Sequence, residues 1–206
     1  MSRLPIRVVK VGGSLLRFEQ LPRALNRWLA DQPAEPHVLV AGGGPLADCI
    51  RDIDQTHAIG ESFAHELCVH LLETTGRLVE HWVDGARLIT RFDELQQELA
   101  ESAPRRALVF SVEDFLQRHE DHVPGVPLAH SWRTSADSIA ARVAVALQAR
   151  ELVLLKSCDP PALDNLQTVA DGTLVDLRSV SRVGVSDLGA NAARIEDFLN
   201  RFPTAG

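Results

Sequence analysis

The strongest constraint on the fold of this chain is a strand, turn and helix signature near its start, with the sequence VVKVGGSLL over residues 8–16. Branched apolar residues around one lysine predict a buried strand, and the two glycines and serine predict a tight turn that opens a helix. Such glycines let a backbone approach a ligand closely, and a helix N-terminus favours anions. A glycine turn with nothing bound gives the same pattern, so both interpretations stay open at this point.

Lysine is rare in this sequence, which makes its positions informative. Among the 21 lysines and arginines, only Lys10 and Lys156 are lysines, and each lies in or directly after an apolar run. A lysine at the end of a buried strand is costly unless an anion accompanies it. We therefore expect one anionic site reached from two strand ends, with chance placement as the alternative. The expected partner of Lys156 is Asp137, Asp159 or a ligand phosphate.

A second unit repeats the first. An apolar run at 37–41 predicts a strand, the glycines Gly42, Gly43 and Gly44 predict a turn, and residues 46–53 are typical of a helix. Together with a helix predicted over 18–29, this order indicates βαβ connections and a parallel sheet, hence an α/β fold in a single domain over residues 1–206. Ligands of such sheets lie at the carboxyl ends of the strands, where both glycine turns would meet.

The remaining elements follow from hydrophobic spacing. A long helix is predicted over 63–82, with Phe63, Leu67, Leu71 and Leu78 on one side. This helix could be an interface in a homo-oligomer, although a buried core helix has the same pattern.

Ser135 or Asp137 can cap a helix of small residues that runs to about Ala149. Further helices are predicted at 88–99 and 190–198, and strands at 106–110, 152–155 and 182–185.

Composition limits the partners and the compartment. The net charge of −7 over 206 residues argues against a nucleic-acid partner. Three cysteines without a CxxC pair indicate a reducing compartment, and the first strand begins too early for a signal peptide. No apolar run reaches the length of a membrane span, so we expect no membrane partner and a cytoplasmic protein. P-loop, GxGxxG and GxSxG motifs do not occur in the sequence.

No protein metal site is expected. His65 and His70 are five residues apart, which places them on different sides of a helix. His119, Asp121 and His122 could bind a metal, but a solvated polar loop is the more common origin of such a cluster.

The order of these parts resembles the amino acid kinase superfamily. VVKVGGSLL is similar to the opening strand of that family, and VAGGGPLAD is similar to its second glycine loop. Within the family, the segments LAHSWRTSADSIAARVAVALQARELVLL and CIRDIDQTHAIGESFAHELCVHLL resemble the small-molecule kinases of methanofuran biosynthesis. Those enzymes phosphorylate an aminomethyl-furanmethyl phosphate with ATP.

The resemblance implies a three-layer αβα sandwich around a mainly parallel sheet, with ATP as phosphoryl donor and Mg²⁺ accompanying it. Lys10 would neutralise charge on the transferring phosphoryl group, and Asp137 would orient that lysine. Phosphoryl transfer depends on positioning and charge stabilisation more than on a protein nucleophile, which suits these residue types. The resemblance also implies that Gly12, Gly13 and Ser14 bind the phosphates. The residues that it implies for binding the acceptor are Gly42, Gly43, Gly44, His130, Ser131 and Trp132. The alternative for Trp132 is that it only packs in the protein.

The turn after the strand at 152–155 departs from the family pattern. The family usually has Thr-Asp-Val-Asp-Gly there, whereas this chain has SCDPP after Lys156, and only Asp159 fits. Two prolines remove backbone donors and stiffen the turn. We expect Lys156 and Asp159 to supply the nucleotide contacts of this region. A non-catalytic protein that binds a nucleotide or an oxyanion is the second hypothesis.

Overall fold

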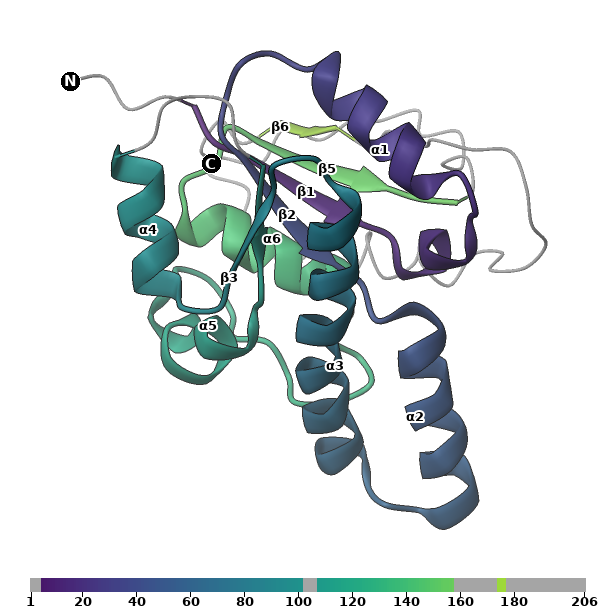
Figure 1. Ribbon diagram of the computed structural model, residues 1–206. Coiled ribbons are helices and arrows are strands. Elements are labelled where there is room, and N and C mark those ends of the chain that lie inside the picture. The colour runs from purple at the N-terminus through teal and green to yellow at the C-terminus, as the bar shows by residue number, and fades with distance from the viewer. Residues whose placement is uncertain (1–4, 102–106, 158–173, 177–206) are drawn as a thin grey trace, which may run out of the picture.

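A parallel sheet forms the centre of the molecule in the computed structural model, which describes residues 5–101, 107–157 and 174–176 (Figure 1). The sheet has six strands in the order β3-β4-β2-β1-β5-β6, and every neighbouring pair is parallel. The expected parallel α/β sheet is thereby confirmed. The strands are β1 (Arg7–Val11), β2 (His37–Ala41), β3 (Arg87–Ile89), β4 (Ala107–Phe110), β5 (Glu151–Leu155) and β6 (Leu174–Asp176).

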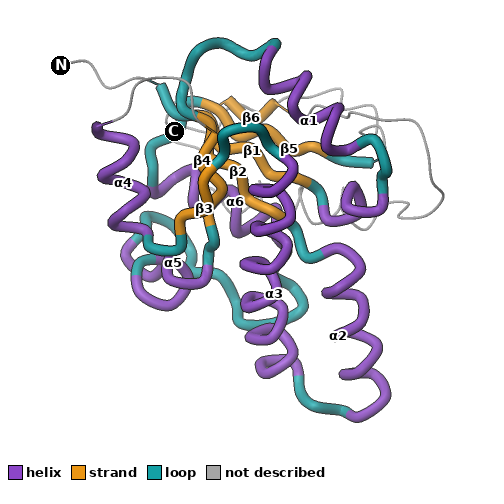
Figure 2. The backbone as a smooth tube through the Cα atoms, in the orientation of Figure 1, coloured by secondary structure: helices purple, strands orange, loops and turns teal. Residues whose placement is uncertain are grey.

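Helices connect the strands from β1 to β5 and cover both faces of the sheet, as Figure 2 shows. Helix α2 extends away from the sheet and packs beside α3 (Figure 1). The helices are η1 (Gly13–Arg17), α1 (Leu21–Ala30), α2 (Gly44–His57), α3 (Glu61–Trp82), α4 (Phe92–Glu101), α5 (Glu113–Arg118), η2 (Glu120–His122) and α6 (Ala136–Ala146), where η marks a 3-10 helix.

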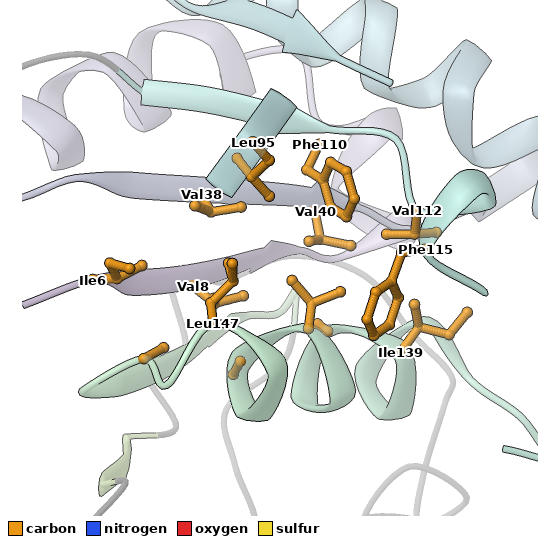
Figure 3. Close-up of a cluster of buried hydrophobic side chains, with 14 of the residues drawn as sticks. Ile6, Val8, Val38, Val40, Leu95, Phe110, Val112, Phe115, Ile139 and Leu147 are labelled. Atoms are coloured by element: carbon orange, nitrogen blue, oxygen red, sulfur yellow. The ribbon is translucent and has the colours of Figure 1, made fainter. Parts of the chain in front are cut away.

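Alternating strand residues build two separate cores, so the molecule is the expected αβα sandwich. Val9 and Val11 of β1 pack with α1 and the end of α3, in a cluster that includes Leu25 and Val79. Val8 points to the other face and packs with α4, α5 and α6. Figure 3 shows this second cluster, with Ile139 of α6 and Leu147, directly after the helix, facing the strand residues.

The predicted helix at 88–99 is wrong at its start. Residues Arg87–Ile89 form strand β3, which pairs with β4, and the helix begins only at Phe92. Leu88 has the right spacing to continue the apolar side of α4, which is why the sequence pattern suggested one helix. Tertiary pairing prevails there: the Leu88 N–H donates to Glu80 at 2.7 Å and the Phe92 N–H donates to Asp114 at 2.9 Å.

Helix α3 matches its predicted extent but not its predicted orientation. Phe63 and Leu78, which the sequence placed on its apolar side, are 51% and 38% exposed. Helix α3 meets the sheet at Gly76, where an added Cβ would be in van der Waals contact with Leu88 at 3.4 Å and with Val109 at 3.6 Å. The buried side of α3 consists of Ala64, His65, Val69, Leu72, Thr75, Gly76 and Val79.

Three further expectations concern the rest of the chain. The polar segment with His119, Asp121 and His122 contains the short helix η2 rather than a simple loop. The strand expected at 182–185 and the helix expected at 190–198 lie outside the described residues, and strand β6 was not expected. No helix in the described part is both long and apolar enough to cross a membrane.

Candidate functional site

Strand alternation explains how both lysines reach the same face of the sheet. In β1, Lys10 follows Val8 by two residues and therefore points towards α6. In β5, Leu154 also packs on the α6 side, and Lys156 is the next residue in that alternation. Because Lys10 pairs with Leu154, Lys156 lies one step beyond it at the carboxyl edge of the sheet.

Asp137, in the first turn of α6, joins the two lysines. Its Oδ1 lies 2.7 Å from Lys10 Nζ in an ion pair without a well-aligned hydrogen bond, and its Oδ2 accepts a hydrogen bond from Lys156 Nζ. Burial alone would raise the pKa of Asp137, but the charges of Lys10 and Lys156 outweigh it and lower the pKa from 3.8 to about 2. These three side chains together carry a net charge of +1 at neutral pH, which suits an anionic ligand.

The cap of α6 is provided by Ser135 and not by Asp137. The Ser138 N–H donates to Ser135 Oγ at 3.2 Å, and the Ser138 hydroxyl accepts in return from the Ser135 N–H at 3.2 Å. This capping box satisfies the helix start without the aspartate. Of the two caps that the sequence allowed, the structure uses Ser135, and Asp137 is left to hold the lysines.

The two glycine turns pack directly against each other. A Cβ on Gly13 would lie 2.3 Å from the Gly44 nitrogen, and one on Gly42 would lie 2.7 Å from the Gly13 nitrogen and 3.3 Å from Lys10 Cε. A Cβ on Gly12 would lie 2.5 Å from the Leu155 carbonyl oxygen. Glycine is therefore required at these positions to let the ends of β1, β2 and β5 come together around Lys10.

The backbone of the first turn differs from the expectation at Gly12. Its N–H donates to Leu155 O at 2.9 Å, so this amide is already used within the protein and is not available to a phosphate. Within the described ranges, the N–H groups of Gly13 and Ser14 have no protein acceptor. The Ser14 hydroxyl lies 2.8 Å from the Ser157 hydroxyl, which ties the turn after β1 to the residues after β5. Asp159 lies outside the described residues.

We expect Gly13→Ala to lower the free energy of unfolding by about 1–3 kcal/mol, the usual effect of adding a methyl group where no space is left. Here the added Cβ would meet backbone atoms of Gly44. Urea denaturation followed by circular dichroism measures this. Ser14→Ala, at the neighbouring exposed position, is the control and should change the free energy by less than about 0.5 kcal/mol. A stable Gly13→Ala variant would contradict the close packing of the two turns.

His130, Ser131 and Trp132 lie further out, against α2 and α3. The indole Nε1 of Trp132 donates to Asp54 Oδ2 at 2.8 Å, and its backbone N–H donates to Glu61 Oε1 at 2.9 Å. Asp54 comes ten residues after Gly44 in α2, which corresponds to roughly 15 Å along the helix. The Trp132 indole therefore lies at a distance from the glycine turns.

His130 and His65 form a second contact between this segment and α3. Their rings meet edge to face with centroids 5.7 Å apart. Burial lowers the pKa of His65 below its ordinary value of 6.5, and the neighbouring charge of His130 lowers it further. His65 is therefore neutral in the folded protein at neutral pH.

A pH dependence of stability follows from His65. Because its pKa is lower in the folded state, the unfolded chain binds more protons below pH 6.5. The contribution is fully present above pH 6.5 and is lost as the pH falls through the lowered pKa. We expect His65→Gln to show a smaller loss of melting temperature between pH 7 and about pH 5 than the wild type. Equal losses would contradict a neutral, buried His65.

An anionic phosphate chain suits the positive charge of the described residues at the sheet edge. The described residues contain no group of three or more histidine, cysteine or acidic side chains that could hold a metal. Asp137 is the carboxylate at the site, and both lysines already contact it. Mg²⁺ commonly binds through substrate phosphates and water, with one or two carboxylates, so any Mg²⁺ here would be held mainly by the nucleotide.

Lysines, a carboxylate and two interlocked glycine turns lie together at the carboxyl edge of a parallel sheet, the edge at which α/β proteins bind their ligands. Comparison with known protein families identifies the family to which the chain belongs. The sequence profile of the amino acid kinase family matches residues 5–180, and the chain belongs to that family. A profile of proteins of unknown function (DUF1499) also matches residues 163–202.

One curated relative is the [5-(aminomethyl)furan-3-yl]methyl phosphate kinase of Methanocaldococcus jannaschii, which is 26% identical over 157 residues. The match covers 74% of this chain and 66% of that protein, slightly less than two thirds of the relative.

Solved structures of similar fold include two uridylate kinases. The enzyme of Archaeoglobus fulgidus has a TM-score of 0.53 at 16% identity, covering 76% of this chain and 64% of that one. The UMP kinase of Bacillus anthracis has a TM-score of 0.53 at 11% identity, covering 80% and 68%. These likenesses concern the fold alone and agree with the αβα sandwich described above.

Proposed function

We propose that this protein is a phosphotransferase that moves the γ-phosphoryl group of ATP to a small metabolite. The observation that carries the proposal is the cluster of Lys10, Asp137 and Lys156 beside the two glycine turns. In such a transfer an acceptor oxygen forms a bond to the γ-phosphorus, the bond to the bridging oxygen breaks, and ADP leaves. Charge builds up on the phosphoryl oxygens, and two fixed ammonium groups stabilise it without having to reorganise.

Each member of the cluster has a separate part in the proposal. Lys10 lies beside Gly42 and would contact the transferred phosphoryl group. Lys156, at the end of β5, would contact the nucleotide phosphates from the neighbouring strand. Asp137 would hold both ammonium groups close together and in place, since two unpaired lysines at this spacing repel each other. Gly13, Ser14, Gly43 and Gly44 would bring backbone amides close to the phosphates, whereas the Gly42 N–H already donates to Val11 O at 2.9 Å.

The proposed acceptor is a phosphomonoester such as [5-(aminomethyl)furan-3-yl]methyl phosphate. The curated relative with that printed activity supports this choice. An acceptor of this kind would place its phosphate near Gly42, Gly43 and Gly44 and its other end towards Trp132, His130 and Ser131. Mg²⁺, a cytoplasmic location and assembly into a homo-oligomer stay predictions from the sequence.

Phosphorus-31 NMR tests the proposal directly. Purified protein is incubated with Mg·ATP and the furanmethyl phosphate, with UMP in a parallel sample. We expect ADP and a new diphosphate signal with the furan compound. ADP formation only with UMP would replace the proposed acceptor, and no ADP with either acceptor would contradict it.

The second candidate is a protein that binds a nucleotide or an oxyanion without transfer. The altered sequence after Lys156, with two prolines, favours it. Saturable stabilisation by Mg·ATP together with no turnover of any acceptor would favour this candidate over the kinase.

A further inference from the structure

Arg142 is a buried arginine whose purpose is not explained by the phosphate cluster. It lies in α6 five residues after Asp137 and is only 2% exposed. Its guanidinium donates to Glu120 Oε1 at 2.5 Å and to the carbonyl oxygens of Pro124 at 2.6 Å, Glu120 at 2.9 Å and Val123 at 3.0 Å. Three of these four hydrogen bonds go to backbone carbonyl oxygens of residues 120–124, so one side chain fixes the backbone in and directly after η2.

The segment at 120–128 is folded around this guanidinium. Gly125 has a φ of +102°, and a Cβ there would lie 3.2 Å from Arg142 Nη1. The Leu128 N–H donates back to Glu120 Oε1 at 3.2 Å, which closes the turn. Lysine could not replace Arg142, because a single ammonium lacks the planar fork that reaches four acceptors in different directions.

The same loop continues to Trp132, whose contacts with α2 and α3 were described above. Asp54 accepts from Trp132 at 2.8 Å and from the Gly60 N–H at 3.0 Å, and Glu61 accepts from the Trp132 N–H at 2.9 Å. The loop is therefore attached to α6 by residues 120–124 and to α2 and α3 by Trp132. Ordering a loop of this length costs conformational entropy, and the partly exposed contacts of Trp132 contribute only modestly to stability on their own.

We propose that Arg142 is a positioning residue for the acceptor side of the site. Together with Glu120, it holds the loop in the position in which His130, Ser131 and Trp132 pack against α2 and α3. The role in acceptor binding rests on the proposed function, whereas the control of Trp132 position does not. Because α6 carries both Asp137 and Arg142, one helix aligns the phosphate cluster and the acceptor loop. Loss of the Arg142 contacts should therefore displace Trp132 while the sheet and the lysines keep their places.

Tryptophan fluorescence tests the structural part of the proposal. Trp28→Phe and Trp82→Phe leave Trp132 as the only tryptophan of the three. In that background Arg142→Met with Glu120→Met removes the whole ion pair, which avoids an unpaired buried charge. We expect the emission of Trp132 to shift to longer wavelength and its quenching by acrylamide to rise at least twofold, at temperatures where circular dichroism shows folded protein.

A matched control separates positioning from general stability. Arg7 and Glu151 form another buried ion pair, at the opposite end of β1 and β5 and far from the loop. Arg7→Met with Glu151→Met should lower or raise the melting temperature without changing the Trp132 signal. An unchanged Trp132 signal in the Arg142 variant, or an equal change in both variants, would overturn the proposal. If the double Met variant does not fold, Glu120→Gln is measured instead: the same direction of shift is expected, and its absence would equally overturn the proposal.

Steady-state kinetics tests the functional part with [5-(aminomethyl)furan-3-yl]methyl phosphate as acceptor. We expect the acceptor KM of the Arg142 variant to rise about tenfold and the KM of Mg·ATP to stay within twofold. Equal increases in both constants would contradict a role on the acceptor side. If the wild type itself shows no transfer, the proposed function fails, while the fluorescence result still decides whether Arg142 positions Trp132.

Discussion

Asp137→Asn is expected to lower the rate of phosphoryl transfer about a hundred- to a thousandfold, the usual effect of removing one preorganised electrostatic group. The carboxylate contacts both Lys10 and Lys156, and without its charge the two ammonium groups repel each other and lose their fixed positions. Binding of Mg·ATP should fall much less, by no more than about tenfold, because the phosphates can replace the lost negative charge. Turnover is measured by coupled ADP detection, and binding by calorimetry.

Stability and helix capping supply the controls for this variant. Breaking a buried ion pair from one side costs about 3–5 kcal/mol, so turnover is compared at temperatures where the variant is folded. The lowered pKa of Asp137 means that its contribution to stability is present above pH 3.8 and is lost as the pH falls towards 2, a loss that the Asn variant should lack. Ser135→Ala removes the cap of α6 and should keep near-normal turnover. Near-normal turnover in Asp137→Asn would show that Asp137 has only a structural role.

Lys156→Met is expected to raise the dissociation constant of Mg·ATP at least tenfold. A hydrogen bond between a charged group and its partner contributes about 1.5–3 kcal/mol, which corresponds to roughly 10- to 150-fold in affinity. The melting temperature without ligand should stay unchanged or rise, because Asp137 keeps its ion pair with Lys10. Differential scanning fluorimetry with and without Mg·ATP measures both effects.

The conservative variant Lys156→Arg is the control for Lys156. It keeps the positive charge at the end of β5 and should retain more than a tenth of the nucleotide affinity. Unchanged affinity and turnover in Lys156→Met would show that this lysine has no part in the site. A large loss of stability without ligand would instead make it a structural partner of Asp137.

The sequence was informative where local pattern and tertiary structure agree. The positions of two rare lysines, each in or directly after an apolar run, were enough to predict that Lys10 and Lys156 meet at one site, and Asp137 was among the expected partners. The glycine turns were also recognised, although the sequence did not show that the two turns pack against each other. In β3 the local pattern suggested a helix, because a strand of three residues has too few positions to show its period.

Other parts of the site depend on contacts that leave no local signal. Asp54 and Glu61 bind Trp132 from 78 and 71 residues away, and Arg142 holds a loop that begins 22 residues before it. An acidic residue on an exposed helix and an arginine in a small-residue helix have no spacing that indicates such partners. The exposed position of Phe63 also leaves no local signal, since the side of α3 that is buried depends on its packing against the rest of the protein.

Isothermal titration calorimetry of Mg·ATP is the sharpest test of a nucleotide site at the sheet edge, with the wild type compared to Lys10→Met and to the double variant Lys10→Met, Lys156→Met. We expect saturable binding to the wild type, at least tenfold weaker binding to Lys10→Met, and no measurable binding to the double variant. Arg77→Met, which removes an exposed ion pair of α3, should bind as the wild type does. No heat with the wild type, or equal affinity in all four proteins, would contradict a nucleotide site at Lys10, Asp137 and Lys156.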